Sequence, residues 1–540
     1  MEPLSKKGGS FLSPFLEKGS MIPKFLIGEK IHMTRPNSHH SRPKWSFKEA
    51  FSGDIDLTSG NLFGKMALYT FPIILLSLLQ LLYSSADEIV VSYFGGGYAS
   101  MNAIGSNSAL INLVIGLFVG TSVGANVVVA KAFGEKDQAK AQKALESSMV
   151  LSVLFGVIIG VIGFFVARYL LIAMQTPSLF LDKATSYLEI YFIGMPFLLV
   201  FNFGSAILRA LGDSKRPLYA LIACGAINVG LNFLFVMAFN LDVVGVGLTT
   251  LISEILEAIL VVIFLASKRQ KFIRFSFKGL RLYKEETLEI LKHGIPAGLQ
   301  SFVFSIANVF IQASVNSYSD ASITSEVAMT GNTASQQVEG YIFIFLDAFS
   351  VATTAVVAQN YGAKKKENVR KAIWYGLFYV LVVGFAVGGI CALFRNELNG
   401  IFIPKESFTS NGVFDQEGYE KSLDVAGQRL IMMGLTYCLD GVMEVLSCDC
   451  RGLGHPKTPT FVIFLFVTCL RLAFIFGLWA NIPAIHTLPW LWSTWPISWV
   501  MAIFVFSFIV PKFYKDAAKK MDAALLEETK KNEAAIPENK

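Results

Sequence analysis

The sequence has few charged residues and few cysteines. Only 16% of its 540 residues are charged, whereas soluble proteins usually carry about 25%, so an ordinary soluble domain is excluded. The six cysteines do not suggest a disulfide framework, because most of them lie within or at the ends of apolar segments. Cys448 and Cys450 form an isolated C-x-C, and two ligands are too few for a zinc site.

Motifs that carry enzyme chemistry are also missing. The sequence contains neither a nucleotide-binding P-loop nor the HExxH pattern of metallopeptidases, so nothing predicts ATP-driven transport or metal-dependent hydrolysis. It also lacks the pattern of charges that forms a ring around a channel pore. We therefore expect a protein that is not an enzyme and that uses neither a cofactor nor a metal.

Long apolar runs are what the sequence has in abundance. Hydrophobic residues make up 53% of it, and they fall in runs long enough to cross about 30 Å of hydrocarbon as helices. Pro72, Pro196 and Pro296 interrupt three of these runs, which membrane helices tolerate. We predict an all-α membrane protein with twelve transmembrane helices, at residues 64–94, 104–131, 146–174, 186–210, 216–240, 243–267, 288–317, 326–358, 369–394, 423–450, 458–480 and 488–511.

Basic residues concentrate after the even-numbered spans. The net charge is +6, but this distribution indicates membrane orientation rather than binding of nucleic acid. The positive-inside rule places both termini in the cytoplasm, and we expect the protein in the inner cell membrane. The residues concerned include Lys131, Lys136, Lys140, Lys143, Arg209, Lys215, Arg216, Lys364, Lys365, Lys366, Arg370, Lys371, Arg451 and Lys457, with the central loop from Lys268 to Lys284.

The two halves of the chain repeat the same motifs in the same order. Three pairs of segments match: Phe71-Pro72 with Ile295-Pro296, Val127–Gly134 with Ala355–Gly362, and Arg209–Gly212 with Arg451–Gly454. Each half has six spans, so both enter the membrane in the same sense, and such a parallel repeat suits alternating access. We predict a cytoplasmic tail at 1–60, an N-lobe at 61–267, a cytoplasmic linker at 268–286, a C-lobe at 287–511 and a second cytoplasmic tail at 512–540.

Polar residues inside the N-lobe spans indicate a cation site. A carboxylate at the centre of a membrane helix costs about 2.5–3.5 kcal/mol on insertion scales, so Asp87 needs a reason to be there. Asn228 and Asn232 are four residues apart and share a helix face, and Thr250 starts the next span. Their oxygens suit Na⁺, and Asp87 alone could bind a proton. The alternatives are that Asp87 caps the outer end of its span and that the asparagines only join helices.

The C-lobe spans carry a second group of acidic residues. Asp440 and Glu444 are spaced i, i+4 on one helix face, and Glu339 in another span could join them. Either the pair shares a proton or it faces a wet cavity, so we expect it to contact substrate or protons. Arg471 is a candidate internal counter-charge, with snorkelling to the membrane surface as the alternative.

The order and doubling of these motifs resemble the multidrug and toxic compound extrusion (MATE) family, bacterial type. The resemblance implies twelve helices in two lobes and cation-coupled drug export. It matches Asp87, Asn228 and Thr250 to the family's N-lobe cation site. Asn232 departs, because archaeal-type members have an aspartate there, and this favours protons over Na⁺. The phrases that carry the resemblance are Phe71-Pro72, Val129–Gly134, Arg209–Pro217, Gln359–Ala363 and Arg451–Lys457.

These observations predict an antiporter that exchanges H⁺ or Na⁺ for an organic compound. The compound is expected to be a small, amphiphilic and cationic molecule, exported by rocker-switch alternating access, and the protein is expected to be a monomer whose other partner is the lipid bilayer. A flippase for lipid-linked intermediates in the same superfamily is the first alternative. A channel or receptor-like membrane protein is an alternative from another class, against which the internal repeat argues.

Overall fold

The computed structural model describes residues 55–94, 98–173, 176, 178–268, 272–320, 323–403, 408–410 and 413–534. Most of the predicted N-terminal tail, residues 1–54, lies outside the described residues. The N-terminal half contains α2 (Leu62–Phe94), α3 (Tyr98–Glu135), α4 (Gln138–Ala173), α5 (Ser178–Ala210), α6 (Lys215–Asn232), the π-helix η2 (Phe233–Ala238), α7 (Asp242–Ala266) and the short 3₁₀ helix η3 (Phe277–Gly279).

The C-terminal half repeats this arrangement with some additions. It contains α8 (Lys284–Ser317), α9 (Ser325–Gly362), α10 (Lys366–Leu393), α11 (Arg395–Phe402), α12 (Gln416–Gly452), α13 (Lys457–Ile463), η5 (Phe464–Cys469), α14 (Leu470–Ala473), η6 (Phe474–Trp479), η7 (Pro483–Ile485) and α15 (Leu488–Ala534). Between α11 and α12, β1 (Thr409–Ser410) pairs antiparallel with β2 (Val413–Phe414).

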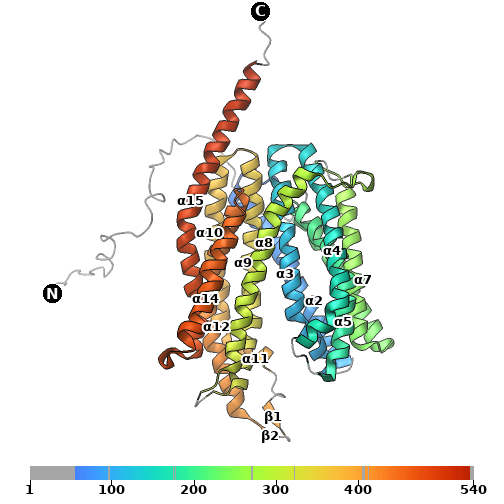
Figure 1. Ribbon diagram of the computed structural model, residues 1–540, viewed down its shortest axis with the longest axis vertical. Helices are drawn as coiled ribbons and strands as arrows, with labels where there is room; N and C mark the ends of the chain where they lie inside the picture. Colours follow the sequence, from blue (N-terminus) through green and yellow to red (C-terminus); the bar gives the residue numbers. More distant parts are fainter. Residues whose placement is uncertain are drawn as a thin grey trace, which may run out of the picture. The chain divides into compact units, whose positions relative to one another are not determined.

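The predicted number of spans is confirmed. Within the described residues, twelve helical segments are long and apolar enough to cross a membrane, and Figure 1 shows them running side by side in two groups. Helices α2 to α7 form the N-lobe, and α8 to α15 form the C-lobe. Pro72, Pro196 and Pro296 lie inside α2, α5 and α8 without ending them, as the bilayer setting allows.

The repeat is visible in the local winding of the helices. If Arg209 is aligned with Arg451, the π-helix that follows α6 in the N-lobe overlaps the position of η6 in the C-lobe. A π-helical segment is rare and often marks a functional position. Its presence at the same place in both halves supports the internal duplication that the sequence motifs predict.

The lobes touch through glycines on α3 and α8. A Cβ atom added to Gly120 would come within 2.5 Å of Gly298 Cα, and one added to Gly124 would come within 2.2 Å of the carbonyl oxygen of Ile290. No side chain fits in these gaps, so glycine is what allows the two backbones to approach. The spacing of small residues along this span indicates close helix packing of this kind.

Further contacts close the same end of the protein. Here the first turns of α2 pack on α9 and α10 of the C-lobe. Tyr379 OH donates to the carbonyl of Phe63 at 2.9 Å. Gln359 Nε2 donates to the carbonyl of Ala210 across the lobes at 2.6 Å. This end carries the turns between α3 and α4, α5 and α6, and α9 and α10, which are the basic turns that the sequence assigns to the cytoplasm.

Helix α15 continues well past the predicted end of the last span. It runs unbroken to Ala534, so the first part of the predicted C-terminal tail is an extension of this helix (Figure 1). The extension is joined to the turn between α9 and α10 by two ion pairs, Lys364 to Glu528 at 2.7 Å and Lys366 to Asp522 at 2.9 Å. This helical extension is therefore attached to the C-lobe.

Candidate functional site

Polar side chains from three N-lobe helices meet in one buried cluster. Asp87 comes from α2, Asn228 and Asn232 from the end of α6, and Thr249 and Thr250 from α7. The amide of Asn232 donates to Asp87 Oδ1 at 2.6 Å and to Asn228 Oδ1 at 3.1 Å. Thr250 donates to Asp87 Oδ2 at 3.3 Å, and Thr249 donates to Asn232 Oδ1 at 2.6 Å. The four residues predicted for this site are thus neighbours, and Thr249 joins them.

The burial of Asp87 and Asn232 determines which ions this cluster can bind. Asp87 is only 8% exposed and Asn232 is fully buried. A buried carboxylate is costly unless hydrogen-bond donors or a cation satisfy it, and here an amide and a hydroxyl donate to it. Carboxylate, amide and hydroxyl oxygens are also ligands that hard cations prefer. The arrangement is therefore chemically able to hold either a proton on Asp87 or a small cation among these oxygens.

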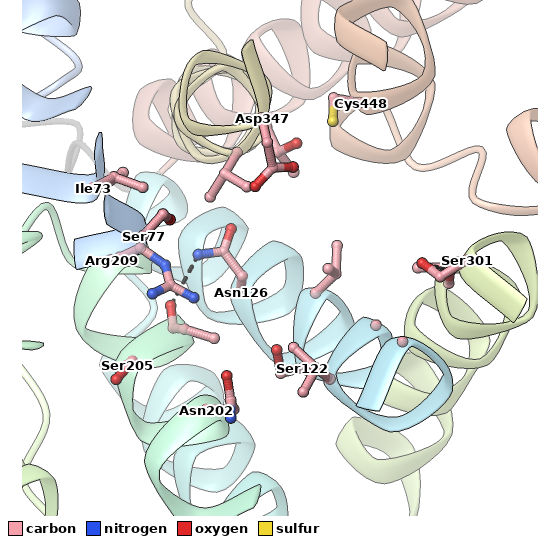
Figure 2. A pocket seen from close by; sticks show the side chains of 18 of the residues that line it. Ile73, Ser77, Ser122, Asn126, Asn202, Ser205, Arg209, Ser301, Asp347 and Cys448 are labelled. Atoms are coloured by element: carbon pink, nitrogen blue, oxygen red, sulfur yellow. Dashed lines mark hydrogen bonds between the residues drawn. The ribbon is translucent and has the colours of Figure 1, made fainter. Parts of the chain in front are cut away.

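A separate cavity of about 450 Å³ lies between the two lobes. Its wall is formed by α2, α3 and α5 from the N-lobe and by α8, α9 and α12 from the C-lobe (Figure 2). A pocket of this size can accept a drug-sized molecule. Most of the lining is apolar or small, and its larger polar members are Gln80, Asn126, Asn202, Gln300, Arg209, Asp347, Glu444 and Arg451.

Two arginines of this wall differ from their predicted place. Arg209 and Arg451 were expected among the basic loop residues, but each lies in the last turn of a long helix and lines the cavity. Arg451 Nη2 donates to Glu444 Oε1 at 2.9 Å, and Arg451 Nη1 donates to Gln300 Oε1 at 2.9 Å. Because α5 and α12 extend to these residues and both side chains line the cavity, the two guanidinium groups belong to the interior and not to a cytoplasmic loop.

Asp440 and Glu444, which were predicted to act together, have different surroundings. Glu444 lines the cavity and is paired with Arg451. Asp440 lies one turn earlier on α12, is 4% exposed and is not among the residues found to line the cavity. The charged groups that act on Asp440 are Glu444, Arg471 and Asp347, so the two predicted carboxylates remain electrostatic neighbours.

Arg471 is buried and does not snorkel. It is fully shielded from solvent, its Nε donates to Ser498 Oγ at 3.0 Å, and its Nη1 donates to Asn308 Oδ1 at 3.2 Å. Its guanidinium also lies over the rings of Phe304 and Trp495, at 5.0 and 5.5 Å from their centres. Of the two interpretations of the sequence, the structure therefore favours an internal counter-charge.

Glu339 is held in an ion pair of its own. Arg429 Nε donates to Glu339 Oε1 at 2.7 Å, and Arg429 Nη2 donates to Glu339 Oε2 at 2.9 Å. Ser335 and Tyr437 donate to the same carboxylate, and the paired side chains are 1% and 3% exposed. A two-pronged pair with additional donors is the geometry of a buried structural contact, and Glu339 is not among the residues found to line the cavity.

Asp347 is a cavity residue that sequence reasoning missed. It lies in α9, within the predicted span 326–358, and its side chain belongs to the cavity wall (Figure 2). Its electrostatic neighbours are Glu444, Arg209 and Arg451. The argument that a carboxylate inside an apolar span needs a functional reason applies to Asp347 as it does to Asp87, and would have identified it.

Comparisons with known proteins agree with this architecture. A model of the MatE family matches residues 72–234 and 296–476, one match in each lobe. The probable multidrug resistance protein YpnP of Bacillus subtilis is 28% identical over 314 residues, which span 58% of this chain and 68% of that protein.

Solved structures also resemble this fold. A MOP superfamily transporter from Pyrococcus furiosus superposes with a TM-score of 0.76 at 20% identity, over 85% of this chain and 98% of that one. A multidrug resistance MATE family transporter in an outward-facing conformation gives 0.74 at 21% identity, over 86% and 98%. At these identities the likeness shows a shared two-lobe fold, and the expected architecture is confirmed.

Proposed function

The chain belongs to the MatE family of membrane transporters, and on this premise we propose that it is a cation-coupled antiporter that exports amphiphilic organic compounds bearing a cationic group. The cavity between the lobes carries this proposal. It is lined by both lobes at positions that the internal repeat makes equivalent, and a binding site at a repeat interface is what rocker-switch alternating access requires.

The Asp87 cluster is the proposed site of coupling. It lies within the N-lobe and shares none of its residues with the cavity lining, so ion and substrate would occupy different places and communicate through helix movement. We propose that protons alone suffice and that Na⁺ is optional. A neutral amide at Asn232 leaves the site with one fewer negative charge to offset the cost of stripping water from a metal cation, whereas Asp87 can still take up a proton.

The C-lobe carboxylates complete the proposal. Glu444 reaches the cavity, so we propose that it meets substrate, with Asp440 acting on it through the electrostatic contact between them. Glu339 was also expected to take part in substrate or proton binding. Its pairing with Arg429 favours a structural role for it instead.

Orientation follows from the basic turns. We propose an inner-membrane location with both termini in the cytoplasm, and a protein that works as a monomer. The contact of Gly124 with Ile290 and the bond from Gln359 to Ala210 then lie on the cytoplasmic side of the cavity. Closure on that side supports an outward-facing state, in which the Asp87 cluster takes up a proton from outside and the cavity releases substrate there.

Reconstitution tests the proposal. In Na⁺-free proteoliposomes, an imposed pH gradient should drive a fluorescent organic dye through the purified protein in the direction opposite to the flow of protons. Asp87→Asn should abolish this movement while the protein remains folded, because the proton-binding group is lost and no unpaired charge is created.

Asp182→Asn is a matched control for that experiment. Asp182 lies outside the cluster, and its side chain is 82% exposed in a surface pair with Arg168, so this variant should transport as the wild type does. Strict dependence of the wild type on Na⁺, or full transport by Asp87→Asn, would contradict the proposed coupling.

A further inference from the structure

The cavity is built twice from equivalent positions of the two lobes. Aligning Arg209 with Arg451 also aligns Asn202 with Glu444, because each lies seven residues before its arginine. All four of these residues line the cavity. Differences between the two walls can therefore be identified position by position, and two of them change the charge of the wall.

The first difference leaves the N-lobe arginine without an ion pair. In the C-lobe, Glu444 neutralises Arg451 at 2.9 Å. In the N-lobe the matching residue is Asn202, whose amide donates to the carbonyl of Leu198 at 2.8 Å on its own helix. Within the described part of the chain, Arg209 makes no salt bridge, and its Nε is buried without a hydrogen-bond partner. The N-lobe wall thus carries one uncompensated positive charge.

The second difference gives the opposite wall a negative charge. Aligning Val127 with Ala355 makes Val119 of α3 equivalent to Asp347 of α9, and both line the cavity. Asp347 makes no salt bridge with any residue that the structure describes, although Arg209 lies within electrostatic reach. Figure 2 shows the two side chains on different walls, Arg209 from α5 and Asp347 from α9.

The result is a cavity that is neutral as a whole and polarised across its width. A simple organic cation would meet Asp347 favourably but would leave the guanidinium of Arg209 uncompensated, and would be repelled by it in a site of low dielectric. A simple anion would be attracted by Arg209 but repelled by Asp347. A molecule that carries a charge of each sign can satisfy both charges together, with its apolar part against side chains such as Ile73, Leu76 and Phe201.

We propose that the exported compounds are zwitterions, with the cationic group bound at Asp347 and an anionic group bound at Arg209. This inference rests on the proposed export function and narrows its substrate class. The anionic group is a carboxylate or another planar or tetrahedral oxyanion, because the fixed fork of guanidinium donors matches such groups with two parallel hydrogen bonds. Arg209 is then a specificity-determining residue.

A pair of dyes with one chromophore tests the inference. Rhodamine B is a zwitterion at pH 7, and its methyl ester is a permanent cation of nearly the same size. Binding of each to the purified full chain in lipid nanodiscs is measured by fluorescence anisotropy, without any gradient. We expect the wild type to bind rhodamine B about tenfold more tightly than the ester, equivalent to about 1.4 kcal/mol.

The internal repeat supplies the decisive variant. Asn202→Glu copies the Glu444–Arg451 arrangement into the N-lobe, so that Arg209 stays in place but is neutralised from its own helix. Asn202→Glu should bind rhodamine B and its methyl ester with about equal affinity, or should bind the ester more tightly. Asn202→Gln enlarges the same side chain without adding charge and should keep the preference.

The outcomes separate this inference from the proposed function. A wild type that binds the two dyes equally, prefers the ester or binds neither overturns the inference, as does an unchanged preference in Asn202→Glu. Retained preference for rhodamine B with no gradient-driven transport of any dye supports the anion subsite and overturns the antiporter proposal instead.

Discussion

Removing Arg429 should destabilise this protein more than removing an arginine from its surface. The guanidinium is 1% exposed and pairs in two-pronged fashion with Glu339, which is 3% exposed. It also donates to Asn332 Oδ1 at 2.8 Å and lies 4.7 Å from the ring centre of Trp495. Breaking a buried pair by removing one partner costs about 3–5 kcal/mol, because the other charge is left uncompensated. Arg429→Met should therefore lower the free energy of unfolding by about this amount.

The measurement is reversible unfolding by sodium dodecyl sulfate in mixed micelles, followed by helical circular dichroism. Arg168→Met is the control, since its pair with Asp182 at 2.7 Å is 52% and 82% exposed and such surface pairs contribute about 0–1 kcal/mol. Adding Glu339→Gln to Arg429→Met should recover much of the loss, because no charge then remains buried. The reasoning is refuted if Arg429→Met costs no more than Arg168→Met, or if the double variant is less stable than the single one.

Two further predictions concern coupling and lobe movement. Asn232→Asp should make transport depend on a Na⁺ gradient, since a second carboxylate beside Asp87 favours a metal cation; transport that remains indifferent to Na⁺ in flux assays would count against this site. Gly124→Leu should abolish transport, because even a Cβ at this position would come within 2.2 Å of the Ile290 carbonyl oxygen. The control Gly389→Leu should transport normally, because the space around Gly389 is open.

The sequence was most informative where a polar residue interrupts an apolar run. Asp87, Asn228 and Asn232 stand out on these grounds, and the structure places them in one hydrogen-bonded cluster. Helix number and the two lobes followed from span length and repeated motifs, because both are local properties of the chain. Thr249 was harder to separate from Thr250, since sequence spacing alone does not say which of two adjacent hydroxyls faces the neighbouring helix.

The cavity was the part that sequence could not supply. An arginine near the end of a span fits a cytoplasmic loop equally well, and only the packing of α5 and α12 shows that Arg209 and Arg451 face inward. Pairing is likewise a tertiary property. That Glu444 belongs to Arg451 and Glu339 to Arg429 depends on helix rotation, which hydrophobic runs in a bilayer specify weakly. The charge difference between the lobes likewise depends on packing, because only the fold brings Asn202, Arg209 and Asp347 to the wall of one cavity.

The extended end of α15 offers a direct optical readout of the transport cycle. This helix is continuous to Ala534 and is tied by Glu528 to Lys364 of the C-lobe, so a fluorophore on its last turns follows that lobe. A second fluorophore at Lys136, in the turn between α3 and α4, follows the N-lobe. Energy transfer between the two dyes then reports the distance between these points of the two lobes in single molecules, while ions and substrate are exchanged around them.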